Sequence, residues 1–318
     1  MKESIKGAII LSLLSPFFAE VLSGSTPPSE AIANPLSFPL LWAYYGSGVI
    51  LLRELWVRKN PTPMGLMLIG FSYGIMEEGL FIKSWFDPHW MDLGILGTYG
   101  RIWGINTVWA TWLTIFHGFM SVWVPITVFN LIYPNLAKEK LIGKRGTLLL
   151  LVIFTLMAIL MFFGLNPYMP PLPQYSLAAL LAVITLYFST KFKLSPLGEK
   201  RLSALTKRPF VLGLLYSIAM FIIFVFIPYT DIPFPVPIVL GIPLAILFFQ
   251  VQVGKKERYV QRILLGSLSF WLLFYDFALF TMGYPLELAF GAITYGTLFY
   301  IYSKRFCIGW KECMRSER

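Results

Sequence analysis

The chain has 318 residues, of which 57% are hydrophobic and 13% charged, and its mean hydropathy is +0.70. This composition is typical of an integral membrane protein and argues against an ordinary soluble domain. The formal net charge of +10 does not indicate nucleic-acid binding, because basic loops orient a membrane protein and attract anionic lipids of the inner leaflet.

Apolar runs long enough to cross a bilayer recur along the whole chain. They predict an all-α polytopic bundle of about ten transmembrane helices, with residues 1–318 forming a single transmembrane domain. The predicted spans are 7–23, 37–56, 64–84, 107–133, 146–165, 175–191, 209–228, 235–252, 261–282 and 285–303. Polar residues within spans fall mainly in 7–133 and 261–282, so 146–252 is predicted to be scaffold.

Basic residues set the predicted orientation. With the amino terminus inside the cell, all basic residues except Lys83 and Arg101 fall on the cytoplasmic side. This alternation predicts a multi-pass protein of the plasma membrane with both termini cytoplasmic. Arg53 and Glu54, at the inner end of the second span, are predicted to form a local ion pair.

Two adjacent carboxylates, Glu77 and Glu78, lie deep inside the third predicted span. A carboxylate in hydrocarbon costs several kcal/mol unless it is protonated, paired or bound to a cation. Gly70 and Gly74 share the helix stripe of Glu78, which predicts close approach of a partner helix on that side. Tyr73, one turn before Glu77, is placed to hydrogen-bond to it.

Three more polar side chains share the depth of this pair. Glu20, Glu77 and Asp276 lie at similar distances from the inner ends of their spans, roughly 20 Å up a hydrocarbon core of about 30 Å. His117 lies near the middle of the fourth span. These residues predict a polar layer in the outer half of the bilayer.

Three interpretations of this layer compete. In a hydrolase, one glutamate is the general base that activates water, alone or on a metal, and His117 stabilises the oxyanion or ligates the metal. In a transporter, the carboxylates carry protons or bind a cation. In the third interpretation, the polar cluster only fixes helix packing.

A Glu-Glu pair inside a span, followed by a histidine in the next span, resembles the CPBP family of intramembrane proteases. That family includes the type II CAAX prenyl endopeptidases and the abortive-infection proteins. Its first motif, Glu-Glu-x-x-x-Arg, corresponds to 77–82, where Ile82 stands in place of arginine and Lys83 follows. Its second motif, Phe-x-x-x-His, corresponds to 113–117 with Leu113 in place of phenylalanine, and no histidine follows to supply a third motif. Alternatively, 117–121 corresponds to the third motif and the second one is missing.

The resemblance implies that Glu77 activates water, that Glu78 assists, and that His117 acts at the oxyanion or on a metal. The segments that begin at Glu20, Tyr45 and Tyr73 also resemble an uncharacterised group of prokaryotic polytopic membrane proteins, a resemblance that implies no activity.

The sequence favours a membrane-embedded, protease-like hydrolase, with a proton- or cation-coupled transporter and a non-catalytic polar cluster as alternatives. The expected substrate is membrane-borne or external, and a divalent metal such as zinc is the possible cofactor, held by Glu77 and His117. The predicted catalytic residues are Glu77, Glu78 and His117, and the predicted supporting or ion-binding residues are Glu20, Asp276, Tyr73 and Lys83.

Overall fold

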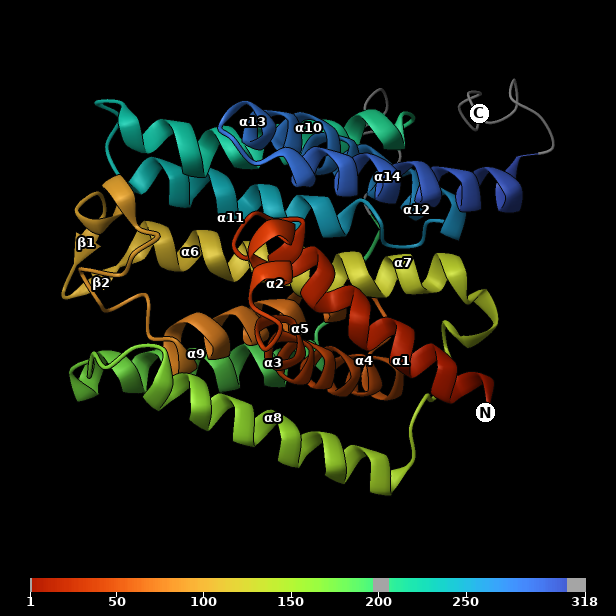
Figure 1. Cartoon of the computed structure of the whole chain (residues 1–318), viewed down its shortest axis with the longest axis horizontal. Helices are drawn as coiled ribbons and strands as arrows, with labels where there is room; N and C mark the ends of the chain where they lie inside the picture. The colour runs from red at the N-terminus through yellow and green to blue at the C-terminus, as the bar shows by residue number, and fades with distance from the viewer. Residues whose placement is uncertain (1, 197–205, 308–318) are drawn as a thin grey trace.

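The computed structural model describes residues 2–196 and 206–307, and most of these residues are helical (Figure 1). The α-helices are α1 Glu3–Pro16, α2 Pro28–Ala33, α3 Ser37–Leu41, α4 Ser47–Lys59, α5 Pro63–Gly74, α6 Thr107–His117, α7 Val124–Ile132, α8 Lys144–Gly164, α9 Leu172–Ser189, α10 Pro209–Phe221, α11 Pro235–Gln250, α12 Glu257–Ser269, α13 Asp276–Thr281 and α14 Pro285–Phe306. Every predicted span coincides with one or more of them. The predicted all-α class is therefore confirmed.

Several helices continue through π-helical turns. Within the described residues these are η1 Phe17–Val21, η2 Trp42–Gly46, η3 Ile75–Phe81, η5 Gly118–Trp123, η7 Ile222–Phe226 and η9 Phe270–Tyr275. A π-helical turn widens the helix locally and redirects its side chains, and such turns occur frequently at functional sites.

Six of the described helical segments are long and apolar enough to cross a membrane. They are Glu3–Val21, Thr107–Ile132, Lys144–Gly164, Leu172–Ser189, Pro209–Tyr229 and Glu257–Thr281. The other predicted spans are helical but shorter or more polar. The helix that ends at Lys59, for example, carries Arg53, Glu54 and Arg58 in its last two turns.

The segment Thr107–Ile132 forms the centre of the bundle, since 83% of its most apolar stretch is buried, against 11% in α8. In Figure 1 the long helices run roughly along the horizontal axis, with α8 and α9 at the lower edge and α10 and α13 at the upper edge. The exposed face of α8 is apolar and includes Leu148, Leu156 and Phe163. That face suits contact with lipid tails.

The predicted close approach on the glycine stripe of α5 is confirmed. A Cβ atom at Gly70 would lie 2.7 Å from Gly118 Cα, and one at Gly74 would lie 3.0 Å from Thr114 Cα. The backbones of α5 and of α6–η5 therefore touch where Glu78 and His117 face each other.

Substituting Gly70 by alanine is expected to destabilise the protein by about 1–3 kcal/mol, because neither backbone can move aside without disturbing the packed core. Gly296, in the interior of α14, has open space around its Cα and provides the control. Gly296→Ala should be neutral or stabilising by up to about 1 kcal/mol. Thermal unfolding in detergent compares the two, and equal melting temperatures would contradict the contact.

A short hairpin sets the start of α6. Strands β1 (Arg101–Ile102) and β2 (Ile105–Asn106) pair antiparallel, and the two turn residues, Trp103 and Gly104, have φ angles of 50° and 75°. Positive φ at both central residues is what a tight two-residue hairpin turn requires. The Asn106 side chain then accepts a hydrogen bond from the Trp109 amide at 3.1 Å and caps α6, which ends at His117.

Candidate functional site

Glu77, Glu78 and His117 meet in the interior of the bundle. Glu77 and Glu78 lie in η3, and His117 is the last residue of α6. His117 Nε2 lies 3.1 Å from Glu78 Oε1, and His117 Nδ1 lies 3.1 Å from Glu77 Oε2. The exposed fractions of the three residues are 0%, 6% and 4%, so the imidazole bridges two carboxylates in a closed, buried cluster.

A second chain of hydrogen bonds extends the cluster through Tyr45. The Tyr45 hydroxyl hydrogen-bonds to Glu77 Oε1 and, at 2.5 Å, to Glu20 Oε1. Thr26 Oγ1 donates to the other Glu20 oxygen at 3.0 Å. Glu20 is therefore joined to the cluster as the shared depth predicted, with a tyrosine between the two carboxylates.

On the opposite side, Ser84 and Trp109 hold Glu78. Ser84 Oγ donates to Glu78 Oε2 and accepts a hydrogen bond from Trp109 Nε1 at 3.0 Å. Both oxygens of Glu78 therefore have partners, which fixes the carboxylate and, through it, the ring of His117.

The three glutamates of this network and Tyr45 all lie in π-helical turns. Glu20 is in η1, Tyr45 in η2 and the pair Glu77–Glu78 in η3, while η5 begins directly after His117. The π turns rotate these side chains relative to a regular α-helix, so that residues from four helices converge at one level.

One carboxylate oxygen of the cluster is left over. Glu77 Oε2 is buried and has no hydrogen-bond partner among the described residues, although His117 Nδ1 lies nearby. Nδ1 is instead 2.9 Å from Ser121 Oγ. A buried oxygen without a partner needs an explanation, and a bound proton, water molecule or cation would supply one.

The donor set, two carboxylates and one imidazole, suits a small divalent ion in its chemistry. Ligand atoms of Glu77, Glu78 and His117 all lie within 4.8 Å of one another. Two ligands bound about 2.1 Å from one tetrahedral ion lie about 3.4 Å apart, close to the separation of His117 Nε2 and Glu78 Oε1. Glu77 faces the other ring nitrogen, Nδ1, at 3.1 Å.

Asp276 does not join this network. It is buried at the start of α13, and a Cβ atom at Gly291 of α14 would collide with its carboxylate. Its electrostatic neighbour is Glu287, also buried, and none of the oxygens of this second acid pair has a hydrogen-bond partner among the described residues. The structure thus brings Asp276 to a different place in the bundle.

The predicted hydrogen bond from Tyr73 to Glu77 is wrong. The ring of Tyr73 lies beside that of Tyr45, with centroids 6.2 Å apart, but its hydroxyl does not reach Glu77. Tyr45, from a different helix, makes the bond instead.

Lys83 is also not at the cluster. It has a φ of 65°, is fully buried, and its Nζ donates to the Phe162 and Asn166 carbonyls at 2.7 and 2.6 Å. The lysine therefore caps the carboxyl end of α8, where a cation is favoured by the helix dipole. Its left-handed backbone turns the chain so that Ser84 returns to Glu78.

Lys83→Met is expected to destabilise the protein by about 3 kcal/mol, since it leaves two buried carbonyls without their charged donor. Thermal unfolding beside Lys59→Met, an exposed lysine at the end of α4, measures the effect. An unchanged melting temperature for Lys83→Met would show that the cap contributes nothing.

Most of the hydroxyl groups that complete the site were not among the predicted site residues. Tyr45, Thr26, Ser84 and Ser121 each hydrogen-bond to a site residue. The spacing of Ser121, four residues after His117, was the one local signal available, because i and i+4 residues share a helix face. The other three reach the site only through folding.

Comparison with known proteins places the chain in a family. A family model described as an uncharacterized membrane protein family matches residues 9–290. No curated protein and no solved structure matches the chain. The matching family carries no protease description, so the predicted likeness to intramembrane proteases gains no support from it.

Proposed function

The chain belongs to an uncharacterized membrane protein family, and from this premise we propose that it is a membrane-embedded, protease-like hydrolase whose site is Glu77, Glu78 and His117. The observation that carries the proposal is the buried Glu77 Oε2, which has no hydrogen-bond partner within 2–196 and 206–307 and lies 3.1 Å from His117 Nδ1. A carboxylate oxygen without a hydrogen-bond partner, beside an imidazole, is the arrangement that a general base needs.

In this proposal Glu77 Oε2 takes a proton from water as the water oxygen attacks a carbonyl carbon. The proton passes to His117 and then to the departing amine, whose bond to the carbonyl carbon breaks. Glu78 holds the imidazole ring in place, and Tyr45 fixes the other Glu77 oxygen. Since the site is buried, substrate and water must reach it through an opening of the bundle.

A divalent metal such as zinc would be held by Glu77, Glu78 and His117, and it would supply Lewis acidity at the attacked carbonyl. Elemental analysis of the purified protein tests this part. We expect stoichiometric metal in the wild type and in Asp276→Asn, and its loss in Glu77→Gln and His117→Ala. Equal metal content in all four proteins would exclude this site as the ligand set.

A second candidate function, a proton- or cation-coupled transporter, is favoured by the continuous chain Glu20–Tyr45–Glu77–His117–Glu78. A series of titratable groups at such short distances is suited to moving a proton between carboxylates once His117 Nδ1 turns from Ser121 to Glu77. Proton flux into liposomes, abolished by Glu20→Gln, together with an absence of metal, would place this function ahead of hydrolysis.

We further propose that the helices cross the plasma membrane ten times, with both termini cytoplasmic. The basic segments support this orientation. Cysteine labelling from each side of intact cells tests it: a cysteine at position 98 should react from outside, and one at position 140 only after permeabilisation.

A further inference from the structure

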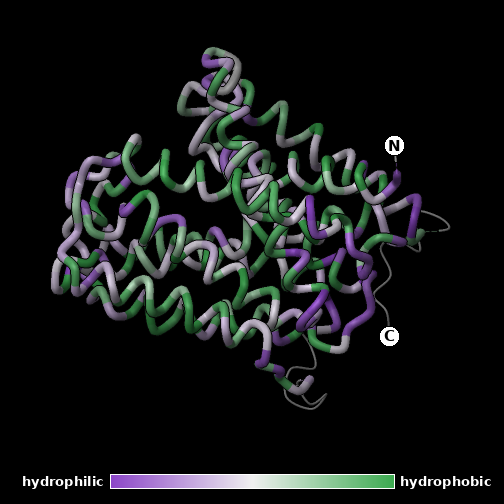
Figure 2. The backbone as a smooth tube through the Cα atoms, turned by 90° about the horizontal axis from the view of Figure 1, so that it is seen from below, coloured by the Kyte–Doolittle hydropathy of each residue, from purple (hydrophilic) through white to green (hydrophobic). Residues whose placement is uncertain are grey.

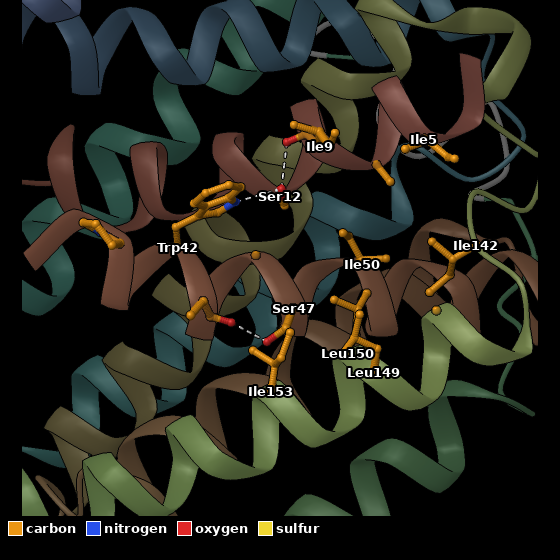
Figure 3. Close-up of a pocket in the computed structure, with 15 residues that line it drawn as sticks. Ile5, Ile9, Ser12, Trp42, Ser47, Ile50, Ile142, Leu149, Leu150 and Ile153 are labelled. Carbon is orange, nitrogen blue, oxygen red and sulfur yellow. Dashed lines mark hydrogen bonds between the residues drawn. The ribbon is translucent and has the colours of Figure 1, made fainter. Parts of the chain in front are cut away.

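An apolar groove of about 500 Å³ lies apart from the Glu77 site, between α1, the η2–α4 helix and α8 (Figure 3). Ile5, Ile9 and Ser12 of α1 form one wall, Ile50 of α4 lies opposite, and Leu150 belongs to the wall made by α8. None of the residues that line the groove belongs to the Glu77–His117 network.

The walls of the groove offer almost no hydrogen-bonding group. Ser12 Oγ accepts from Trp42 Nε1 at 2.9 Å and donates to the Ile9 carbonyl, and Ser47 Oγ donates to the Ala43 carbonyl. The hydroxyls of both serines therefore already have hydrogen-bond partners, and the rest of the groove wall is hydrocarbon. The occupant that such walls select is an apolar chain.

The groove opens sideways from the bundle. Ile5, Ile9 and Leu149 line it and are 45%, 38% and 60% exposed. Both α1 and α8 belong to segments long enough to cross a membrane, so this opening faces lipid. From Ile5 to Ser12 the helix rises about 10 Å, which fits within the roughly 15 Å of hydrocarbon in one leaflet.

One end of the groove is basic. Arg145 precedes Leu149 by four residues and so continues the stripe of α8 that lines the groove, and Lys2 directly precedes α1, three residues before Ile5. Lys144 begins α8, whose amino terminus has no side-chain cap and favours an anion. Glu3 is the one acid among residues 2–6 and 143–146. Hydrophilic segments gather at this end of the molecule (Figure 2).

We propose that the groove binds one acyl chain of an anionic glycerophospholipid, with the lipid phosphate at Lys2, Lys144 and Arg145. The apolar walls exclude a polar ligand, and the basic end favours an anionic lipid over a zwitterionic one. The proposal does not depend on the hydrolase, since it uses none of its residues.

Two tryptophan variants test the binding site of the acyl chain. Leu150→Trp fills the groove, whereas Leu151→Trp adds the same bulk to a neighbouring residue that is 47% exposed and does not line it. Lipids that survive a detergent wash are extracted and quantified per protein chain. We expect about one phosphatidylglycerol in the wild type and in Leu151→Trp, and at least a tenfold loss in Leu150→Trp. Equal retention in both variants, or no retained lipid in any of the three proteins, would overturn the proposal.

Two double variants, each of which removes two basic side chains, test the site of the lipid headgroup. Melting temperatures are measured with added phosphatidylglycerol or phosphatidylcholine for Lys144→Gln/Arg145→Gln and for the control Lys191→Gln/Lys193→Gln beyond α9. Phosphatidylglycerol should stabilise the wild type and the control but not the first variant. Equal stabilisation by both lipids would refute the anionic preference. A dimer that dissociates only in Leu150→Trp would assign the groove to a second copy of the chain.

Discussion

Glu77→Gln is expected to lower the proposed hydrolysis by a factor of about 10²–10⁴, the usual contribution of a general base. Glutamine has nearly the same shape and keeps an oxygen for the Tyr45 hydroxyl, but its amide cannot take a proton from water. The fold should therefore remain while the chemistry is lost.

The measurement compares new peptide termini, by mass spectrometry, in membranes of cells that express the wild type or Glu77→Gln. Asp276→Asn is the matched control, because it removes a buried carboxylate that lies outside the network. Peptide termini that appear equally in all three proteins would contradict the assignment of Glu77. A folded Glu77→Gln protein that loses proton flux instead would favour the transporter.

Arg53→Met is expected to destabilise the protein by about 3–5 kcal/mol, because it leaves the buried carbonyls that Arg53 binds without their charged donor, although Glu54 keeps Arg58 as a partner. The Arg53 guanidinium is fully buried, lies 3.2 Å from Glu54 Oε1 and donates to the carbonyls of Leu136 and Glu139. The predicted ion pair is thus confirmed, and it also ties the loop after α7 to α4.

Thermal unfolding in detergent should show a fall of at least about 5 °C for Arg53→Met. Lys59→Met removes a nearby exposed cation and should change stability by less than about 0.5 kcal/mol. A melting temperature of Arg53→Met equal to that of Lys59→Met would mean that the loop is held by other contacts.

The core of the candidate site was predictable because burial in hydrocarbon makes ionisable residues conspicuous. Glu77, Glu78, His117 and Glu20 stand out by residue type and by their depth along predicted helices. The structure brings these four together. The close approach at Gly70 was also predictable, for a different reason: small residues at helix spacing indicate a contact between helices.

Asp276 shows the limit of counting along a helix. Its position along the helix predicts a depth, but depth does not determine which neighbour a side chain faces. In the folded chain it packs on Gly291 and beside Glu287, where the absent side chain of the glycine leaves room.

Sequence information alone therefore establishes a membrane protein, the positions of its helices and the residues that carry its buried charge, because these depend on local hydrophobicity and residue type. Packing of the folded chain establishes the partners: Tyr45 in place of Tyr73 on Glu77, and Lys83 on α8 in place of the site. The reason is that the partner of a side chain depends on the direction in which that side chain points from its helix. π-helical turns and the left-handed Lys83 rotate side chains about the helix axis, and only contacts between distant segments stabilise those rotations.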